Sequence, residues 1–266
     1  MERYYHPNLR KRIDNYSCDA CQRYKLDGRD AGKLAPQVAR AAPWEQVNID
    51  LIGPWSVDVR TGSSYEFMAL TCIDCVTCLA ELIRIDDKTA QHVATKFDEC
   101  WLSRHPRPMM CCHDNGGEFT GWEFQQPLAD FGIKDVPTTS LNPASNGICE
   151  RMHQTVGNVM RTLVHKNRPR TLKHAQIVID QGLASASHAV RTNVNQTTGY
   201  TPGALAFHRD MLLNIPLVVD LLDVRAKRQL RVDHDLLRAN ARRSAFDYKQ
   251  GGQFLKQRHD RTKLGE

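Results

Sequence analysis

Short apolar runs and helical periodicities alternate along the chain in an order that predicts an α/β fold. Apolar runs bounded by turn residues predict five strands, at 47–54, 65–73, 78–85, 109–113 and 133–137. Apolar positions at steps of three and four predict helices at about 88–104, 118–131, 147–166 and 172–191, a short turn or helix at 203–208, and a helical segment at about 221–249. The first three strands follow one another closely, which indicates an antiparallel meander.

The helix that follows Asn146 has two different faces. One apolar stripe consists of Ile148, Met152, Val156, Val159 and Leu163. Glu150, Gln154 and Arg161 fall together on the other side, with His153 nearby. A carboxylate at the start of a polar stripe suits a metal ligand that faces a phosphate backbone. Periodicity alone also fits an ordinary amphipathic helix with a solvated polar face.

Three carboxylates stand at positions where chemistry is expected. Asp50 lies inside an apolar strand pattern bounded by Gly53-Pro54, and a buried aspartate is costly unless it is paired, hydrogen-bonded or metal-bound. Asp114 ends another apolar run, before an Asn-Gly-Gly turn. Glu150 follows after 35 residues, which leaves room for a helix, a strand and a loop. The chain can therefore return Glu150 to the end of Asp114's strand. For Asp50, an aspartate that forms a hydrogen bond to a loop at a strand end is the alternative interpretation.

Charge and composition narrow the class of protein. The net charge is +6, with +7 in residues 225–261, +3 in residues 1–33 and −4 in the rest. Basic arms around a mildly acidic middle suit nucleic-acid contact by the arms and cation binding by the core. No apolar run reaches the ~18 residues of a membrane span, so we expect no membrane contact. Nine cysteines, an odd number that includes an adjacent pair, predict reduced thiols in an intracellular protein.

Cysteine spacings suggest metal sites that lack ligands. Cys18 and Cys21 form a Cys-x-x-Cys pair, half of a tetrahedral zinc site, and His6 is the only upstream histidine. This zinc site is incomplete as it stands, so either further ligands precede residue 1 or these cysteines bind no metal. Cys72, Cys75 and Cys78 also have metal-like spacing, but in a strand–turn–strand they need not converge.

Several motifs together resemble the integrases of gypsy-type LTR retrotransposons, which carry a retroviral-type integrase catalytic core. The matching stretches are Trp44-Glu-Gln-Val-Asn-Ile-Asp50-Leu-Ile-Gly-Pro, His113-Asp114-Asn-Gly-Gly-Glu-Phe119, Asn142-Pro-x-x-Asn-Gly-x-x-Glu150-Arg, Thr198-Gly-Tyr-Thr-Pro202 and Phe207-His-Arg-Asp210. The resemblance covers almost the whole chain. It implies a ribonuclease-H-like mixed five-stranded sheet flanked by helices, with a partial N-terminal zinc-domain remnant and a basic helical C-terminal extension.

The resemblance also implies domain boundaries. Residues 1–33 would be the partial zinc-binding-like segment, 34–43 a linker and 44–207 the integrase catalytic core. Residues 208–266 would be a basic helical linker and the start of a truncated C-terminal domain. The chain departs from the family at both ends, because the paired zinc histidines are absent and the C-terminal barrel is cut short.

The activity implied by the resemblance is metal-dependent 3′-end processing and DNA strand transfer. Two Mg²⁺ (or Mn²⁺) ions, ~3.5–4 Å apart, would be held by Asp50 bridging both, Asp114 on one and Glu150 on the other. The partners would be double-stranded DNA, from element ends and target, and further copies of the chain, in the nucleus after a cytoplasmic particle stage. Candidate DNA contacts are His113, Asn115, Asn142, Asn146, Gln154 and Arg161 near the metals, and Arg225, Lys227, Arg228, Arg242 and Arg243 in the basic extension.

Two other readings fit part of the sequence. A ribonuclease H or structure-specific nuclease would share the fold, but it would use a different carboxylate pattern and lack the Asn-Pro-x-x-Asn-Gly-x-x-Glu context. A domesticated or truncated integrase-derived protein would bind DNA without catalysis, and a recently truncated copy would keep all three carboxylates. Joining of DNA strands separates the integrase from both.

Overall fold

The computed structural model describes residues 32–39, 42–138, 147–166, 168–213 and 215–245. Val38–Arg231 form one compact unit. The described part of a second unit consists of residues 32–37 and 232–245. Cys18, Cys21, Asn142 and Asn146 lie outside the described residues, so the predictions made for them stay predictions.

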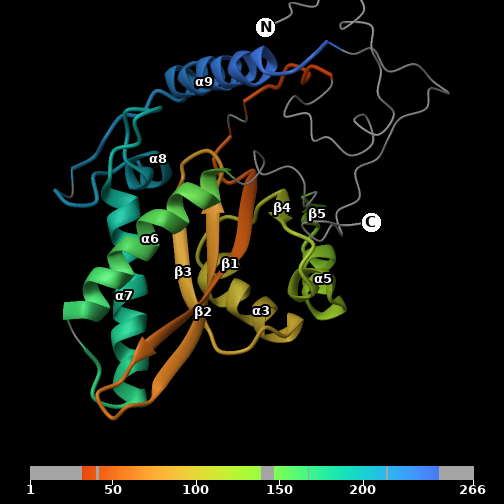
Figure 1. Ribbon diagram of the computed structural model, residues 1–266. Coiled ribbons are helices and arrows are strands. Elements are labelled where there is room, and N and C mark those ends of the chain that lie inside the picture. The colour runs from red at the N-terminus through yellow and green to blue at the C-terminus, as the bar shows by residue number, and fades with distance from the viewer. Residues whose placement is uncertain (1–31, 40–41, 139–146, 167, 214, 246–266) are drawn as a thin grey trace, which may run out of the picture. The chain divides into compact units, whose positions relative to one another are not determined.

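The larger unit is built on one five-stranded sheet in the order β3-β2-β1-β4-β5 (Figure 1). Its strands are β1 (Gln46–Asp58), β2 (Ser64–Asp74), β3 (Ala80–Ile85), β4 (Met110–His113) and β5 (Lys134–Pro137). β1, β2 and β3 pair antiparallel, and β4 and β5 add parallel to β1. The predicted meander and mixed five-stranded sheet are confirmed.

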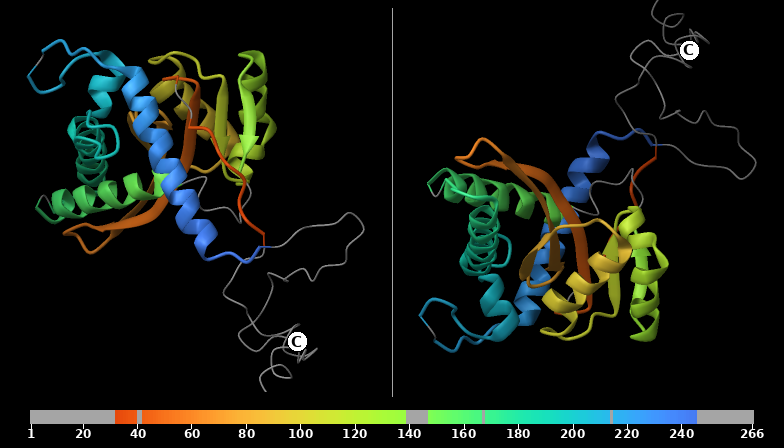
Figure 2. Two further views of the ribbon diagram at one scale, coloured as in Figure 1. Left: turned by 90° about the horizontal axis from the view of Figure 1, so that it is seen from above. Right: turned by 90° about the horizontal axis from the view of Figure 1, so that it is seen from below.

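Helices cover both faces of this sheet. They are α3 (Ala90–Phe97), the π-helical turn η1 (Asp98–Leu102), α4 (Gly117–Thr120), α5 (Trp122–Asp130), α6 (Gly147–Lys166), α7 (Leu172–Thr192) and α8 (Pro202–Phe207). The two views of Figure 2 show α6 and α7 on one side and α3 and α5 on the other. Each side has its own hydrophobic core, with Val156 and Ile179 in one and Phe97 and Phe124 in the other.

Strand β1 is longer than the sequence predicts. We expected it to end at Gly53-Pro54, but pairing with β2 resumes at Trp55 and runs to Asp58. The peptide before Pro54 is cis, and the register shifts between Ile52 and Trp55. Proline donates no hydrogen bond, so it interrupts the ladder, and the bulge lets the strand continue beyond it. Gly53, at φ +114°, takes the positive φ that this irregularity requires.

Because of the bulge, the same face of β1 packs on the α6–α7 core before and after Pro54. Ile52 belongs to the α6–α7 core, whereas Ile49 and Leu51 belong to or pack on the α3–α5 core. Side chains alternate along a strand, so Asp50 lies on the α6 face with Ile52. After the bulge Val57 is again in the α6–α7 core, and Trp55 packs against it. A continuous strip of β1 therefore faces α6.

Helix α9 (Leu221–Ala241) carries much of the basic C-terminal segment. It ends before the predicted limit of about 249. In the second unit the side chain of Asn240 near its end exchanges two hydrogen bonds with the backbone of Leu34, of 2.7 and 3.1 Å. No helix among the described residues has the length and apolarity needed to cross a membrane.

Candidate active site

Asp50 lies in the middle of β1, on the face covered by α6. Its backbone pairs with Thr71 of β2, and the Thr71 hydroxyl donates to the Asp50 carbonyl at 3.0 Å. The Asp50 side chain is 22% exposed, whereas the preceding Ile49 is fully buried and the following Leu51 is half-buried. The strand thus holds a carboxylate on a rigid support with an opening to solvent.

Asp114 immediately follows β4, the parallel neighbour of β1. The pairing runs from Gln46 opposite Met110 to Asn48 opposite Cys112. Continuing this register by two residues places Asp114 level with Asp50. Neighbouring strands lie ~4.8 Å apart, so the backbones of the two residues lie side by side on the sheet.

A tight turn after β4 fixes the Asp114 carboxylate. The Gly116 amide donates to its Oδ1 at 3.0 Å. A Cβ on Gly116 would lie 2.8 Å from the Glu118 carboxyl carbon and 3.0 Å from that same Oδ1. A side chain at position 116 would therefore crowd the Asp114 carboxylate and make the Glu118 side chain move, so glycine leaves room for this turn.

Helix α6 carries residue 150 in its first turn. Met152 and Val156, from the predicted apolar stripe, are buried in the core with Met160, and Val159 packs against them. Periodicity therefore located the buried face of α6. The helix lies over the face of β1 that carries Asp50, although the side chain of Glu150 is not among those described. The triad of Asp50, Asp114 and Glu150 stays a prediction.

His153 contacts the Asp50 segment directly. Its Nε2 lies 3.1 Å from the Thr71 hydroxyl oxygen, and its Nδ1 lies 4.0 Å from Asp50 Oδ2. The Thr71 hydroxyl donates to a carbonyl, so it accepts from His153 Nε2–H. Burial lowers the pKa of His153 to about 4, so the ring is neutral near pH 7. Sequence analysis placed His153 near the polar face, but its contact with residue 71 could not be read from local sequence.

His113 is buried rather than exposed, so the structure lends no support to the DNA contact that we predicted for it, and that contact stays a prediction. The residue is only 2% exposed. Its Nε2 lies 2.5 Å from Asp135 Oδ1, and its Nδ1 lies 2.6 Å from the carbonyl oxygen of Asp114. The ring also stacks on Phe119. His113 instead links the end of β4, just before Asp114, to Asp135 of β5.

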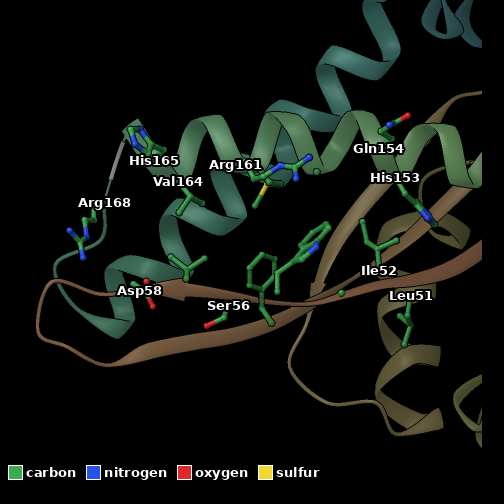
Figure 3. A pocket seen from close by; sticks show the side chains of 16 residues that line it. Leu51, Ile52, Ser56, Asp58, His153, Gln154, Arg161, Val164, His165 and Arg168 are labelled. Carbon is green, nitrogen blue, oxygen red and sulfur yellow. The ribbon is translucent and has the colours of Figure 1, made fainter.

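The other candidate DNA contacts near the carboxylates differ in their surroundings. Asn115 donates to the Thr138 carbonyl at 3.4 Å, which links the turn after β4 to the end of β5. Gln154 and Arg161 are exposed on α6 and line a groove between this helix and β1 (Figure 3). These two therefore remain placed where a nucleic acid could reach them.

The basic residues of α9 and its end also differ from one another. Arg225 is exposed, and Lys227 forms an ion pair with Asp223 at 2.6 Å. Arg228 donates to the Val76 carbonyl at 2.7 Å and so ties α9 to the turn after β2. Arg242 is exposed and Arg243 is half-buried. DNA contact by these five residues stays a prediction. Arg228 also has a structural role, because it holds α9 to the turn after β2.

The donor chemistry of the site fits a hard divalent cation. Asp50 and Asp114 supply carboxylate oxygens, the ligands that Mg²⁺ and Mn²⁺ prefer. The described residues contain no group of three or more His, Cys, Asp or Glu side chains placed to hold a metal, and the Glu150 side chain lies outside them. Cys72, Cys75 and Cys78, which have metal-like spacing and are described, do not form such a group either. Cys75 donates to Asn48, and Cys78 accepts from Asn195.

Comparisons with known proteins agree with this fold. No protein-family model matches the chain. The retrovirus-related Pol polyprotein from transposon TNT 1-94 of Nicotiana tabacum is 37% identical over 118 residues, 43% of this chain and 9% of that protein. The Tf2-3 transposon polyprotein of Schizosaccharomyces pombe is 23% identical over 193 residues, 71% of this chain and 14% of that protein. The chain thus spans only a small part of the length of these relatives.

A solved structure shares the architecture. The simian T-cell lymphotropic virus intasome, in complex with a PP2A regulatory subunit, contains a chain that aligns with a TM-score of 0.56 and 18% identity. The alignment covers 76% of this chain and 67% of that chain. The sequence relatives are retrotransposon polyproteins, and the solved structure shares the fold of this chain. The predicted ribonuclease-H-like fold is confirmed.

Proposed function

We propose that this chain is a retrotransposon integrase, a polynucleotidyl transferase that trims the 3′ ends of element DNA and joins them to target DNA. The observation that supports the proposal most is the parallel pairing of β1, which carries Asp50, with β4, which ends just before Asp114. Helix α6, which carries residue 150 in its first turn, packs against β1 as well. The retrotransposon polyproteins among its relatives support it.

Asp50, Asp114 and Glu150 would hold the metal. When bound, two divalent ions supply charge stabilisation to the phosphoryl oxygens and raise the nucleophilicity of water or a 3′-hydroxyl. In trimming, the water oxygen forms a bond to phosphorus while the bond from phosphorus to the outgoing 3′-oxygen breaks, and that oxygen gains a proton. In joining, the trimmed 3′-hydroxyl attacks a target phosphodiester in the same way, so no protein nucleophile is required.

The residues around the carboxylates hold them in place for this chemistry. The Gly116 amide fixes the Asp114 carboxylate, and His113 ties the Asp114 backbone to β5. His153, as a neutral ring, supports the Asp50 segment through Thr71 without adding a positive charge beside the cation site. Preorganisation of this kind reduces the reorganisation needed at the moment of reaction.

The wider setting is part of the same proposal. Double-stranded DNA from element ends and target would be the substrate, and copies of the chain would act together because two ends must be joined. The protein would act in the nucleus after a cytoplasmic particle stage. The zinc segment at Cys18 and Cys21 would need further ligands to fold.

A strand-transfer assay tests the function. The full chain is incubated with a labelled duplex in Mg²⁺ or Mn²⁺, beside an Asp114→Asn variant and a matched control, Asp98→Asn, which changes an exposed aspartate at the start of η1. We expect joined products from the parent and the control, none from Asp114→Asn, and none in EDTA. Cleavage without joining would indicate a nuclease. DNA binding without either reaction would indicate the non-catalytic alternative.

A further inference from the structure

A groove runs from the candidate active site along β1 and α6. Its volume is about 890 Å³. Leu51, Ile52, His153 and Gln154 lie at one end, and Asp58, His165 and Arg168 at the other (Figure 3). The far end is closed by a hydrogen bond from the Arg60 amide to the Pro169 carbonyl, which joins the β1–β2 hairpin to the α6–α7 loop. The groove therefore opens beside Asp50 and extends away from it.

The floor of the groove is apolar and aromatic. Trp55, Val57 and Phe67 line it, with Met160 and Val164 from α6. Trp55 is half-buried and meets the buried Phe67 edge-on, with ring centroids 5.4 Å apart. Because the bulge keeps Ile52, Trp55 and Val57 on one face, this floor continues the strip of β1 that carries Asp50.

The rim of the groove favours an anion. Arg161 and Arg168 are exposed guanidinium groups, and His165 is exposed beside them. Asp58 is the one acidic residue among the sixteen that line the groove. Asn158 accepts a hydrogen bond from Arg161 at 2.7 Å, which restrains that guanidinium on the helix. Two fixed positive charges above an apolar floor suit a phosphate backbone whose attached rings face inward.

Gly157 opens the helical wall. A Cβ at this position would meet only the Arg161 guanidinium, at 3.9 Å. Glycine is otherwise unfavourable inside a helix by about 1 kcal/mol relative to alanine. Its effect here is to widen the groove opposite β1.

We propose that this groove binds unpaired nucleotides of a DNA strand next to the reacting end. The inference rests on the proposed function, because that function brings a DNA end to Asp50. Bases within a duplex are stacked on one another, so their faces are not free to stack on Trp55, and the polar groups on their edges find no hydrogen-bond partner on the apolar floor. An unpaired base has a free face that stacks on an aromatic ring, while its phosphates reach Arg161 and Arg168. The volume lies within the ~300–1,000 Å³ typical of ligand sites.

Binding of end-modified duplexes tests the proposal without chemistry. The full chain is titrated, in EDTA, into labelled duplexes of one sequence that are blunt or carry a short 5′ or 3′ overhang, with 2-aminopurine in the overhang. We expect one overhang type to bind about 5-fold or more tighter than the blunt duplex, with quenching of its 2-aminopurine by stacking. The two overhang arms identify which strand enters.

Two variants locate the effect in the groove. Gly157→Leu introduces a side chain at a residue that lines the groove, where its Cβ would meet only the Arg161 guanidinium within 4 Å. Thr162→Leu places the same side chain at an exposed position of α6 outside the groove. We expect Gly157→Leu to bind overhang and blunt duplexes equally and Thr162→Leu to keep the preference. Trp55→Leu keeps an apolar floor but removes the ring, so quenching should fall.

The proposal is overturned if the parent binds all three duplexes equally, or if Gly157→Leu keeps the full overhang preference. These results are independent of catalysis. A chain that joins DNA but shows no overhang preference would refute the groove and leave the function standing. A groove-dependent preference in a chain that never joins DNA would refute the function and leave the groove standing.

Discussion

Acid should weaken the fold through His153, and the size of the effect follows from its burial. The pKa of this ring is about 4 in the folded protein, against 6.5 for an unperturbed histidine. Between these values the unfolded chain binds a proton that the folded chain does not, so the free energy of unfolding falls as the pH falls from about 6.5 to 4. Below about pH 4 both states carry the proton and the loss levels off.

The magnitude is set by the difference between the two pKa values. At 1.36 kcal/mol per pH unit it amounts to about 3 kcal/mol for complete protonation. The side chain is 18% exposed, so solvent screens only part of this. The Asp50 carboxylate, 4.0 Å away, would attract a protonated ring and offset some of the loss, which makes about 3 kcal/mol an upper value.

Urea unfolding at a series of pH values measures the effect, in EDTA so that no metal binds. His153→Gln is the matched variant, because its amide can still donate to Thr71 but does not titrate. We expect the parent to lose more stability than the variant on going from pH 7 to 4, by up to about 3 kcal/mol. Identical pH profiles would refute the assignment of a buried neutral ring at this position.

Three substitutions test the supports of the site and core by urea unfolding. His113→Ala should lower the free energy of unfolding by about 3–5 kcal/mol, as for other large buried side chains. His113→Phe should lower it less, because the phenyl ring refills the space and only the hydrogen bonds to Asp135 and the backbone are lost. Equal losses for the two variants would contradict this packing. Gly182→Ala places a Cβ 2.8 Å from Met160 Sδ and should cost about 1–3 kcal/mol by overpacking, whereas an unchanged midpoint would mean that the sulfur moves aside. The buried Asp74 carboxylate accepts hydrogen bonds from the amides of Val76 and Thr77. Asp74→Ala leaves these buried donors unpaired and should cost about 3 kcal/mol or more of the free energy of unfolding, with a smaller loss for Asp74→Asn. A loss below about 0.5 kcal/mol, as at a surface position, would count against this role.

Most strands and helices could be predicted from the local sequence, because each has its own pattern of apolar residues. The apolar runs predicted a strand that contains Asp50 and a strand that ends at Asp114, and the periodicity of α6 predicted its buried face. That the two strands are neighbours was implied only by the family resemblance, and the pairing of β1 with β4 bears it out. The extension of β1 beyond Gly53-Pro54 was missed, since a proline in a strand ordinarily marks its end.

Contacts between distant segments explain what sequence reasoning missed at the site. His153 meets Thr71 across 82 positions, and His113 meets Asp135 across 22. No periodicity or motif reports such pairs, because they depend on how α6 and β5 pack on the sheet. We therefore predicted a DNA contact for the histidine before Asp114, because its burial cannot be seen in the local sequence.

We propose that Asp50, Asp114 and Glu150 form one catalytic centre. The most direct test is whether Glu150→Gln still joins DNA strands. The side chain keeps its size and loses its charge, so folding should be little affected at the first turn of α6. The measurement is the yield of joined DNA from parent and variant chains in Mg²⁺, with DNA binding checked in parallel. We expect the variant to bind DNA like the parent and to give no joined product. Joining by Glu150→Gln at the rate of the parent would contradict it.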